Sequence, residues 1–331
     1  MSNGTTARAP RRRTSTIIGL LVLTILLAGC QLDEALPSAA ACLTGEAADE
    51  PGDFPQFPGD GAQSVALPDG RAVWLLGDTI LSDGKFIRNS AYVQSGACFR
   101  PLLGPGRSEW VPSEAGRWYW PTDAVVEGST LRVYAAEYRA TGPGTWGFVG
   151  VDVDAAIYSL PDLRLLRVEQ TPATGAPSYG MAAEGRYVYG TRHAPEHVGH
   201  DLYVARTGSP WTYWDGLRWN SDPASATAIL EGVDAAGSID RDTGLWRFVN
   251  KDNSIMGRHL VAYTSKNPQG PWRRDVLMEV PGSRPGLFSY TATVHPEQRL
   301  RDGSLLISWN LNADSGVPEE YGPHFATTPR R

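Results

Sequence analysis

The sequence predicts an all-β fold, and two observations lead to this prediction. No segment shows the long apolar period of a helix, whereas short runs of β-branched and aromatic residues recur between turns rich in Gly, Asp, Asn and Pro. One pattern also repeats along the chain. A short strand, a turn and a second strand occur five times at similar spacing.

The repeat predicts how the strands are organised. The five expected strand pairs are 63–67 with 71–77, 123–126 with 130–136, 179–183 with 186–191, 237–240 with 245–250, and 290–295 with 304–310. One or two further strands follow each pair, and residues 321–327 supply a last one. Small sheets that cannot bury their faces alone are stable when arranged radially, so we expect a five-bladed β-propeller over residues 61–328. One or two β-sandwiches are the alternative, but they would not account for the similar spacing.

The N-terminus has the features of an export signal. Four arginines precede the apolar run 17–28, which is shorter than the roughly 20 residues that span a bilayer. The run ends in Leu-Leu-Ala-Gly-Cys30, which resembles the lipobox of bacterial lipoproteins. This resemblance implies that residues 1–29 are a signal peptide and that Cys30 carries a lipid anchor on the outer face of the cell membrane. A plain signal peptide with an incidental cysteine is the alternative.

Residues 30–60 are rich in Ala, Pro, Gly and acids, and we expect them to form the lipidated cysteine and a tether. The chain has three cysteines. With Cys30 lipidated, Cys42 and Cys98 are expected to form a disulfide in an oxidising compartment, or else to remain two buried thiols.

The composition limits the classes of partner that we expect the protein to bind. The formal net charge is -6 and no basic run follows the signal, which argues against nucleic acid as a partner. No cofactor is predicted, and no His/Cys cluster has the spacing of a metal site. The loop that holds His193, His197 and His200 is a weaker alternative for metal binding. We expect a monomer.

A propeller would bring polar residues together at one end. The start of each innermost strand and the end of the next strand lie at the same face, where acids, amides and aromatic residues then collect. This is the composition of a carbohydrate site. The expected substrate-binding residues are Arg88, Asn89, Tyr119, Trp120, Trp146, Tyr179, His193, Asn250, Tyr290, His295, Asn310 and Asn312.

Three carboxylates are candidates for catalysis. Asp78 stands between Gly77 and Thr79 at an expected strand end and is predicted to act as base or nucleophile. Glu137 occupies the matching position of the second unit and is a candidate general acid. Asp123 follows Trp-Pro and is a second candidate for the acid. For Asp78, capping of backbone amides is the alternative role.

Four segments carry a family resemblance. Residues 73–79 with Arg88-Asn89-Ser90, residues 120–123, residues 267–272, and residues 290–296 with 307–312 resemble blades of the domain of unknown function 4185. That family is related to the five-bladed arabinanase-like glycoside hydrolases and includes endo-acting D-arabinan hydrolases. The resemblance runs from about residue 60 to 327.

The resemblance implies a glycoside hydrolase acting on a furanose-rich, arabinan-like polysaccharide. It also implies that a structural cation can sit in the propeller channel, where His295 would contribute. The separate general-acid glutamate of the family 43 hydrolases has no matching blade motif in this sequence. The alternatives are a non-catalytic propeller that binds glycan or protein, and a lyase acting on a uronic acid.

Overall fold

The computed structural model describes residues 47–144, 146–172, 177–242, 244–254, 257–281, 286–298, 300–313 and 321–329. The predicted signal peptide, Cys30 and Cys42 lie outside these residues. Cys98 is disulfide-bonded, but its pairing with Cys42 stays a prediction. Among the described residues, none of the helices has the length and apolar character needed to cross a membrane.

Antiparallel strands dominate the described chain and fall into five consecutive units. The first unit holds β1 (Gly59–Ala66), β2 (Ala72–Ile80), β3 (Phe86–Ile87), β4 (Ser90–Ser95) and β5 (Cys98–Leu102). The second holds β6 (Arg117–Glu127), β7 (Thr130–Ala140), β8 (Phe148–Ser159) and β9 (Leu165–Gln170). The third holds β10 (Ser178–Glu184), β11 (Tyr187–His193), β12 (His200–Arg206), β13 (Thr212–Trp214) and β14 (Trp219–Asn220).

The fourth unit holds β15 (Leu230–Asp242), β16 (Leu245–Asp252), β17 (His259–Ser265) and β18 (Arg273–Glu279). The fifth holds β19 (Leu287–His295), β20 (Leu305–Ala313) and β21 (Gly322–Thr328). Short 3-10 helices lie at η2 (Pro51–Asp53) and η3 (Pro223–Ser225). Pairing between β12 and β15 joins the third and fourth units into one sheet.

All five predicted strand pairs are confirmed. β1 pairs with β2, β6 with β7, β10 with β11, β15 with β16 and β19 with β20, each antiparallel. Local turn chemistry fixes these pairs. Ala66 lies opposite Ala72 across a turn in which Gly70 adopts φ 86°, a conformation that glycine reaches without steric cost. β1 begins at Gly59, inside the segment expected to be tether.

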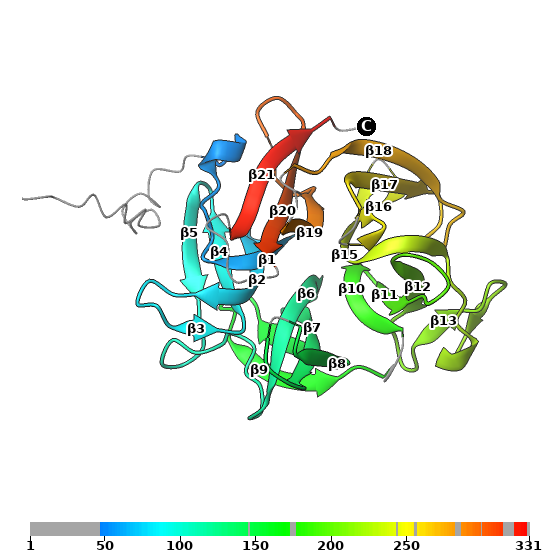
Figure 1. Cartoon of the computed structure of the whole chain (residues 1–331), viewed down its shortest axis with the longest axis horizontal. Coiled ribbons are helices and arrows are strands. Elements are labelled where there is room, and N and C mark those ends of the chain that lie inside the picture. Colours follow the sequence, from blue (N-terminus) through cyan, green and yellow to red (C-terminus); the bar gives the residue numbers. More distant parts are fainter. Residues whose placement is uncertain are drawn as a thin grey trace, which may run out of the picture. The chain divides into compact units, whose positions relative to one another are not determined.

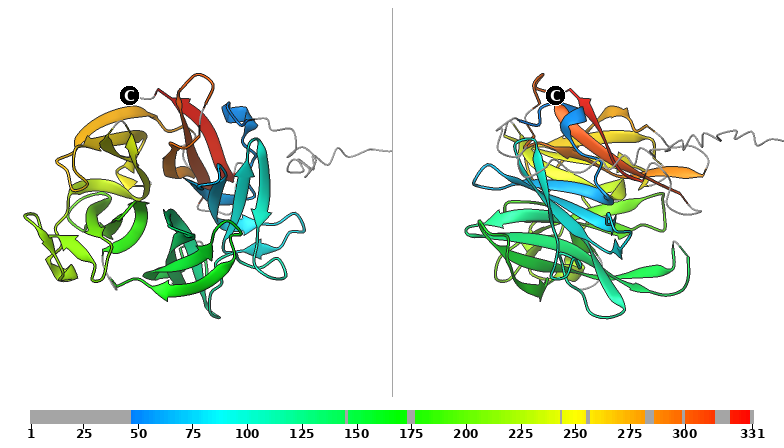
Figure 2. Two further views of the ribbon diagram at one scale, coloured as in Figure 1. Left: turned by 180° about the vertical axis from the view of Figure 1, so that it is seen from behind. Right: turned by 90° about the vertical axis from the view of Figure 1, so that its left-hand side faces the viewer.

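The units follow one another around a common centre, with β1, β6, β10, β15 and β19 nearest to it (Figure 1). The same order is visible from behind (Figure 2). Each of these strands contacts the corresponding strand of the next unit, and β19 contacts β1.

Packing explains this order. Five hydrophobic clusters lie between successive units, and each draws buried residues from two of them. One of these clusters joins the last unit to the first, where Leu306 packs with Trp74 and Phe57. Phe54 and Phe57 also contact Phe325 of β21, which fixes the segment before β1 against the end of the chain. Each sheet therefore buries both of its faces against its neighbours.

Every innermost strand is interrupted by a bulge. The pairing register shifts between Gly61 and Gln63 in β1 and between Pro121 and Asp123 in β6. Similar shifts follow Tyr179 in β10, Val233 in β15 and Tyr290 in β19. Because a bulge turns side chains away from their regular alternation, these positions present residues that a regular strand would bury.

Asn89 links the first unit to the second. Its side chain is fully buried. The Asn89 amide nitrogen donates to the carbonyls of Val111 and Tyr119, at 3.0 Å in both cases, and its oxygen accepts from the Val111 amide at 2.8 Å. Asn89 therefore holds the connection between the units rather than facing a ligand.

Replacing Asn89 by Ala should lower the free energy of unfolding by about 2–4 kcal/mol, because three buried polar groups lose their partners. Chemical unfolding of wild type and variant would measure this. Gln56→Ala, which removes an exposed hydrogen bond to Tyr321, is the matched control and should change stability by less than about 0.5 kcal/mol. Equal losses in both variants would contradict the linking role.

Candidate functional site

A cavity of about 630 Å³ is lined by residues of all five units. The bulges supply much of its surface. Gly61 of β1, Thr122 of β6 and Met181 of β10 line it, as do Ala235 of β15 and Thr291 of β19. The cavity therefore lies where the innermost strands leave their regular pairing.

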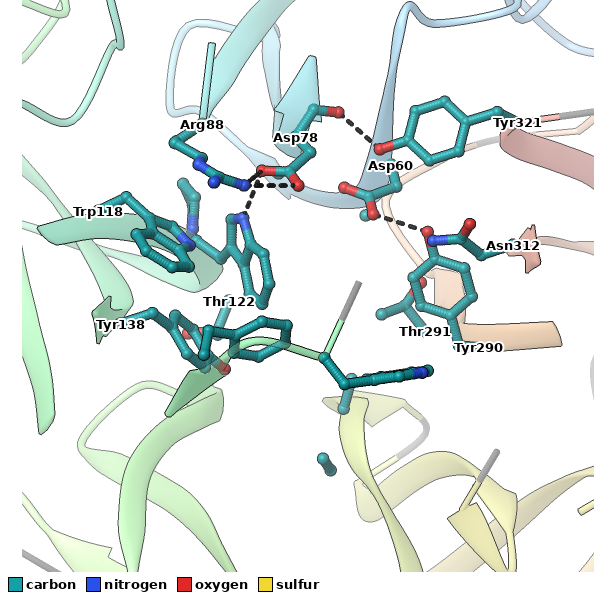
Figure 3. A pocket seen from close by; sticks show the side chains of 18 of the residues that line it. Asp60, Asp78, Arg88, Trp118, Thr122, Tyr138, Tyr290, Thr291, Asn312 and Tyr321 are labelled. Atoms are coloured by element: carbon teal, nitrogen blue, oxygen red, sulfur yellow. Dashed lines mark hydrogen bonds and ion pairs between the residues drawn. The ribbon is translucent and has the colours of Figure 1, made fainter. Parts of the chain in front are cut away.

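Two carboxylates meet in this cavity. Asp60 of β1 and Asp78 of β2 face each other with their oxygens toward the open space (Figure 3). The Tyr290 hydroxyl donates to Oδ2 of Asp60 at 2.6 Å. Trp120 donates its indole N–H to Oδ1 of Asp78 at 2.8 Å, and Arg88 lies 3.2 Å from Oδ2 of Asp78.

The surroundings of the two carboxylates affect their pKa values differently. Burial, and next the nearby charge of Asp78, raise the pKa of Asp60 to about 7. Burial also raises the pKa of Asp78, but the hydrogen bond from Trp120 and the charge of Arg88 oppose this. Asp60 therefore holds a proton up to about neutral pH, whereas Asp78 is the member whose ionised form has a cationic partner, Arg88.

Aromatic rings form one wall beside the carboxylates. Trp120 lies 4.4 Å from Tyr138 and 5.1 Å from Phe148 between ring centroids. Arg88 lies over the ring of Trp118 at 4.3 Å, which holds its guanidinium toward Asp78. Trp118 is buried, whereas Trp120, Tyr138 and Phe148 are partly exposed and offer ring surface to a sugar or another flat group.

Asp234 is a third carboxylate that lines the cavity. It is 4% exposed, and its Oδ1 accepts from the Ala235 amide at 2.7 Å. Its Oδ2 is buried and has no hydrogen-bond partner among the residues that the structure describes. Burial raises the pKa of Asp234, although the charge of Lys251 opposes the shift.

Six of the residues predicted from the sequence line the cavity. They are Asp78, Arg88, Trp120, Trp146, Tyr290 and Asn312. The expected convergence of strand ends therefore occurs for these residues, while their roles stay predictions.

The two other predicted carboxylates do not line the cavity. Asp123 is 4% exposed, and its oxygens accept from the backbone amides of Ala124 and Ala183 at 2.8 and 2.7 Å. It joins β6 to β10. Glu137 is 8% exposed and pairs with Arg117 at 2.8 Å. Both carboxylates are thus engaged by the protein itself.

The remaining predicted residues also lie outside the lining. Tyr119 donates to Asp154 at 2.5 Å, and Tyr179 packs against Tyr213. His193, which is exposed, contacts the ring of His200. Asn89 holds the link described above.

His295 is fully buried, and its ring nitrogens lie 2.6 and 2.8 Å from the hydroxyls of Ser64 and Ser308. Burial lowers its pKa to about 3, so it is a neutral residue engaged by two hydroxyls. The described residues include no group of three or more His, Cys, Asp or Glu that could hold a metal ion.

Asn250 and Asn310 do not line the cavity but bind the backbone of residues that do. The Asn250 oxygen accepts from the Asp234 amide at 2.7 Å, and the Asn310 amide donates to the Gly61 carbonyl at 3.1 Å. Both side chains are fully buried. They fix the bulges of β15 and β1, so they position cavity residues instead of contacting a ligand.

Sequence reasoning missed Asp60, Asp234, Trp118 and Tyr321, all of which line the cavity. Asp60 falls in the segment expected to be tether. The signal that points to it is Gly59-Asp60-Gly61, an acid between two glycines directly before an apolar strand.

Residues 57–328 match the family described as "Domain of unknown function (DUF5005)", and the chain belongs to this family. The resemblance to the domain of unknown function 4185 is not shown by this match. Notoamide biosynthesis cluster protein J of Aspergillus sp. (strain MF297-2) is 23% identical over 308 residues, which cover 75% of this chain and 79% of that protein.

Solved structures share the fold. A presumed hydrolase from Bacteroides ovatus has a TM-score of 0.66 at 20% identity, with 82% of this chain and 85% of that chain covered. The GH43_1 enzyme from Xanthomonas citri complexed with xylose has a TM-score of 0.53 at 14% identity, covering 86% and 92%. The endo-arabinase from Bacteroides thetaiotaomicron has a TM-score of 0.50 at 14% identity, covering 86% and 97%. The chain therefore has the all-β, propeller-like fold of these proteins.

The raised pKa of Asp60 makes a prediction for stability. Its folded-state pKa is about 7 against an ordinary value of 3.8, so the unfolded chain loses this proton first and stability falls as pH rises from about 4 to 7. Asp60→Asn removes that penalty. The stability of the variant relative to wild type should increase by about 2–4 kcal/mol between pH 4 and pH 8.

Guanidinium unfolding at several pH values would measure this difference. Asp162→Asn, which changes an exposed carboxylate in the β8–β9 turn, is the control and should show no such trend. A stability difference for Asp60→Asn that stays constant with pH would rule out the desolvated carboxylate.

Proposed function

We propose that the protein is a glycoside hydrolase whose reacting groups are Asp60 and Asp78. The observation that carries this proposal is the pair of partly desolvated carboxylates, held by adjacent strands in a cavity with an aromatic wall. Paired carboxylates with separated pKa values are the usual acid and base of glycoside hydrolysis. Structures with the same fold include an endo-arabinase and an enzyme complexed with xylose, which supports the assignment.

Each carboxylate has a role that follows from its surroundings. Asp60, with a pKa of about 7, donates its proton to the glycosidic oxygen as the bond to the leaving group breaks. Asp78, whose ionised form is bonded by Trp120 and Arg88, acts at the anomeric carbon as nucleophile or activates a water there. Asp60 thus takes the role of acid that the sequence suggested for Glu137 or Asp123.

The other lining residues bind the sugar. Trp120 and Tyr138 offer ring faces on which a sugar can stack, and Asn312 offers an amide for its hydroxyls. The proposed substrate is a furanose-rich, arabinan-like glycan, in keeping with the resemblance stated above and with the endo-arabinase of similar fold.

We also propose that the five units are the blades of a five-bladed β-propeller. The cyclic contacts of the innermost strands and the hydrophobic cluster between the last and first units support this arrangement.

The hydrolase is tested by sugar release from arabinan, arabinogalactan, xylan and fructan. Wild type should release reducing sugar, and Asp60→Asn and Asp78→Asn should each lose at least about 10³-fold, which corresponds to about 4 kcal/mol of barrier. Glu137→Gln, a carboxylate outside the cavity lining, should retain activity within about tenfold.

The variants distinguish three hypotheses: Asp60 as the general acid, Glu137 as the general acid, and a protein that binds glycan without cleaving it. Loss of activity in Glu137→Gln but not in Asp60→Asn would return the acid to Glu137. Binding of these glycans by wild type without any release of sugar would favour the non-catalytic glycan-binding protein.

We propose that the chain is anchored on the outer face of the cell membrane by lipid on Cys30. Expressed in a bacterium with radioactive palmitate, wild type should carry label and fractionate with membranes, because two acyl chains or more hold a protein stably. Cys30→Ser should carry no label and leave the membrane fraction. Label retained by Cys30→Ser would refute the anchor.

A further inference from the structure

The exposed and the buried parts of the cavity lining differ in chemistry. Among the residues that the structure describes, the exposed lining residues, which we call the rim, carry no charged, hydroxyl or amide side chain: Ile80, Phe86, Ala140, Trp146 and Ala235, together with two glycines of the β7–β8 loop. Phe86 and Trp146 are 48% and 56% exposed. The three lining carboxylates, Asp60, Asp78 and Asp234, belong to the less exposed part, and the side chain of Arg88, which is 37% exposed, lies against Asp78.

The backbone of the rim offers little to a sugar as well. In the β7–β8 loop, the amides of Thr141 and Gly142 both donate to the Gly147 carbonyl, and the Gly147 amide donates to the Gly144 carbonyl. These donors are taken within the loop. A sugar placed against the described part of the rim would therefore gain few hydrogen bonds for its hydroxyls, since the indole N–H of Trp146 is the single polar group among the rim side chains.

At the rim, aromatic residues of different units contact one another. Trp146 comes from the β7–β8 loop of the second unit, and its ring lies 5.8 Å from that of Phe288 on β19 of the fifth unit, at an interplanar angle of 32°. Trp120 and Phe148 of the aromatic wall line the same cavity. Exposed aromatic residues gathered on one concave surface are typical of a binding site for an apolar group.

We propose that the substrate carries a planar apolar group beside the sugar that reaches Asp60 and Asp78, and that the rim binds this group. The proposal rests on the hydrolase function and narrows its substrate class. The polar inner lining takes one sugar unit, and the rim takes an aromatic ring. The ring is attached either as the aglycone or as an aromatic acyl ester on the sugar, since both place the same surface against the rim.

Trp146 is the residue on which to test this. Phe86 is less suitable, because its ring contacts the guanidinium of Arg88 at 4.9 Å, and its loss would disturb the partner of Asp78. Trp146 is exposed, so its replacement should not impair folding. Trp146→Phe keeps a planar ring, and Trp146→Gln replaces it with a polar side chain. Leu217→Ala, which alters a 90% exposed apolar residue outside the cavity, is the control.

Calorimetric binding to the full chain would compare four probes, with Asp78→Asn present in every variant so that no glycosidic bond is cleaved. They are methyl α-L-arabinofuranoside, arabinobiose, 2-naphthyl 1-thio-α-L-arabinofuranoside and the 2-naphthoyl ester of the methyl glycoside. At least one naphthyl probe should bind about tenfold or more tighter than arabinobiose, or about 1.4 kcal/mol. Trp146→Gln should remove this advantage, whereas Trp146→Phe and Leu217→Ala should keep most of it.

Which naphthyl probe gains affinity identifies the attachment. Arabinobiose binding as tightly as both naphthyl probes, or an equal loss for every probe in Trp146→Gln, would overturn the proposal. Because binding needs no turnover, this test can fail while Asp60 and Asp78 still support hydrolysis. It can also succeed if the chain proves to be a non-catalytic binding protein.

Discussion

The structure depends on one constraint: each small antiparallel sheet has two apolar faces and can bury neither alone. The hydrophobic clusters lie between successive units and not within them, and the last unit packs against the first through Leu306, Trp74 and Phe57. The innermost strands are thereby brought to a common centre. A site assembled from all five units follows from packing.

The bulges shape the cavity, because at each of them the innermost strand leaves its regular pairing and presents residues to the cavity. Buried amides such as Asn250 and Asn310 satisfy the backbone groups that the bulges release. The residues that shape the site are therefore distinct from those that would touch a ligand.

The carboxylate pair opposes stability. Burying Asp60 next to Asp78 disfavours ionisation of both, and a folded protein without a task for them would gain from neutral side chains. Trp120, Arg88 and Tyr290 offset part of this cost through hydrogen bonds. Such partial compensation keeps one carboxylate ready to give a proton and the other ready to stay ionised, which is the division of roles that acid and base catalysis needs.

The sequence by itself determined the all-β class and the five strand pairs, because alternation and turn chemistry act between residues close in the chain. It also identified Asp78, Trp120 and Tyr290, since the ends of paired strands lie at one face whenever such units are arranged radially. Only the tertiary structure decided which carboxylate faces Asp78. Asp60 reaches the cavity through a bulge, while Asp123 and Glu137 are taken by backbone amides and by Arg117. Those choices depend on contacts between units, and the local sequence carries only the Gly59-Asp60-Gly61 signal for Asp60.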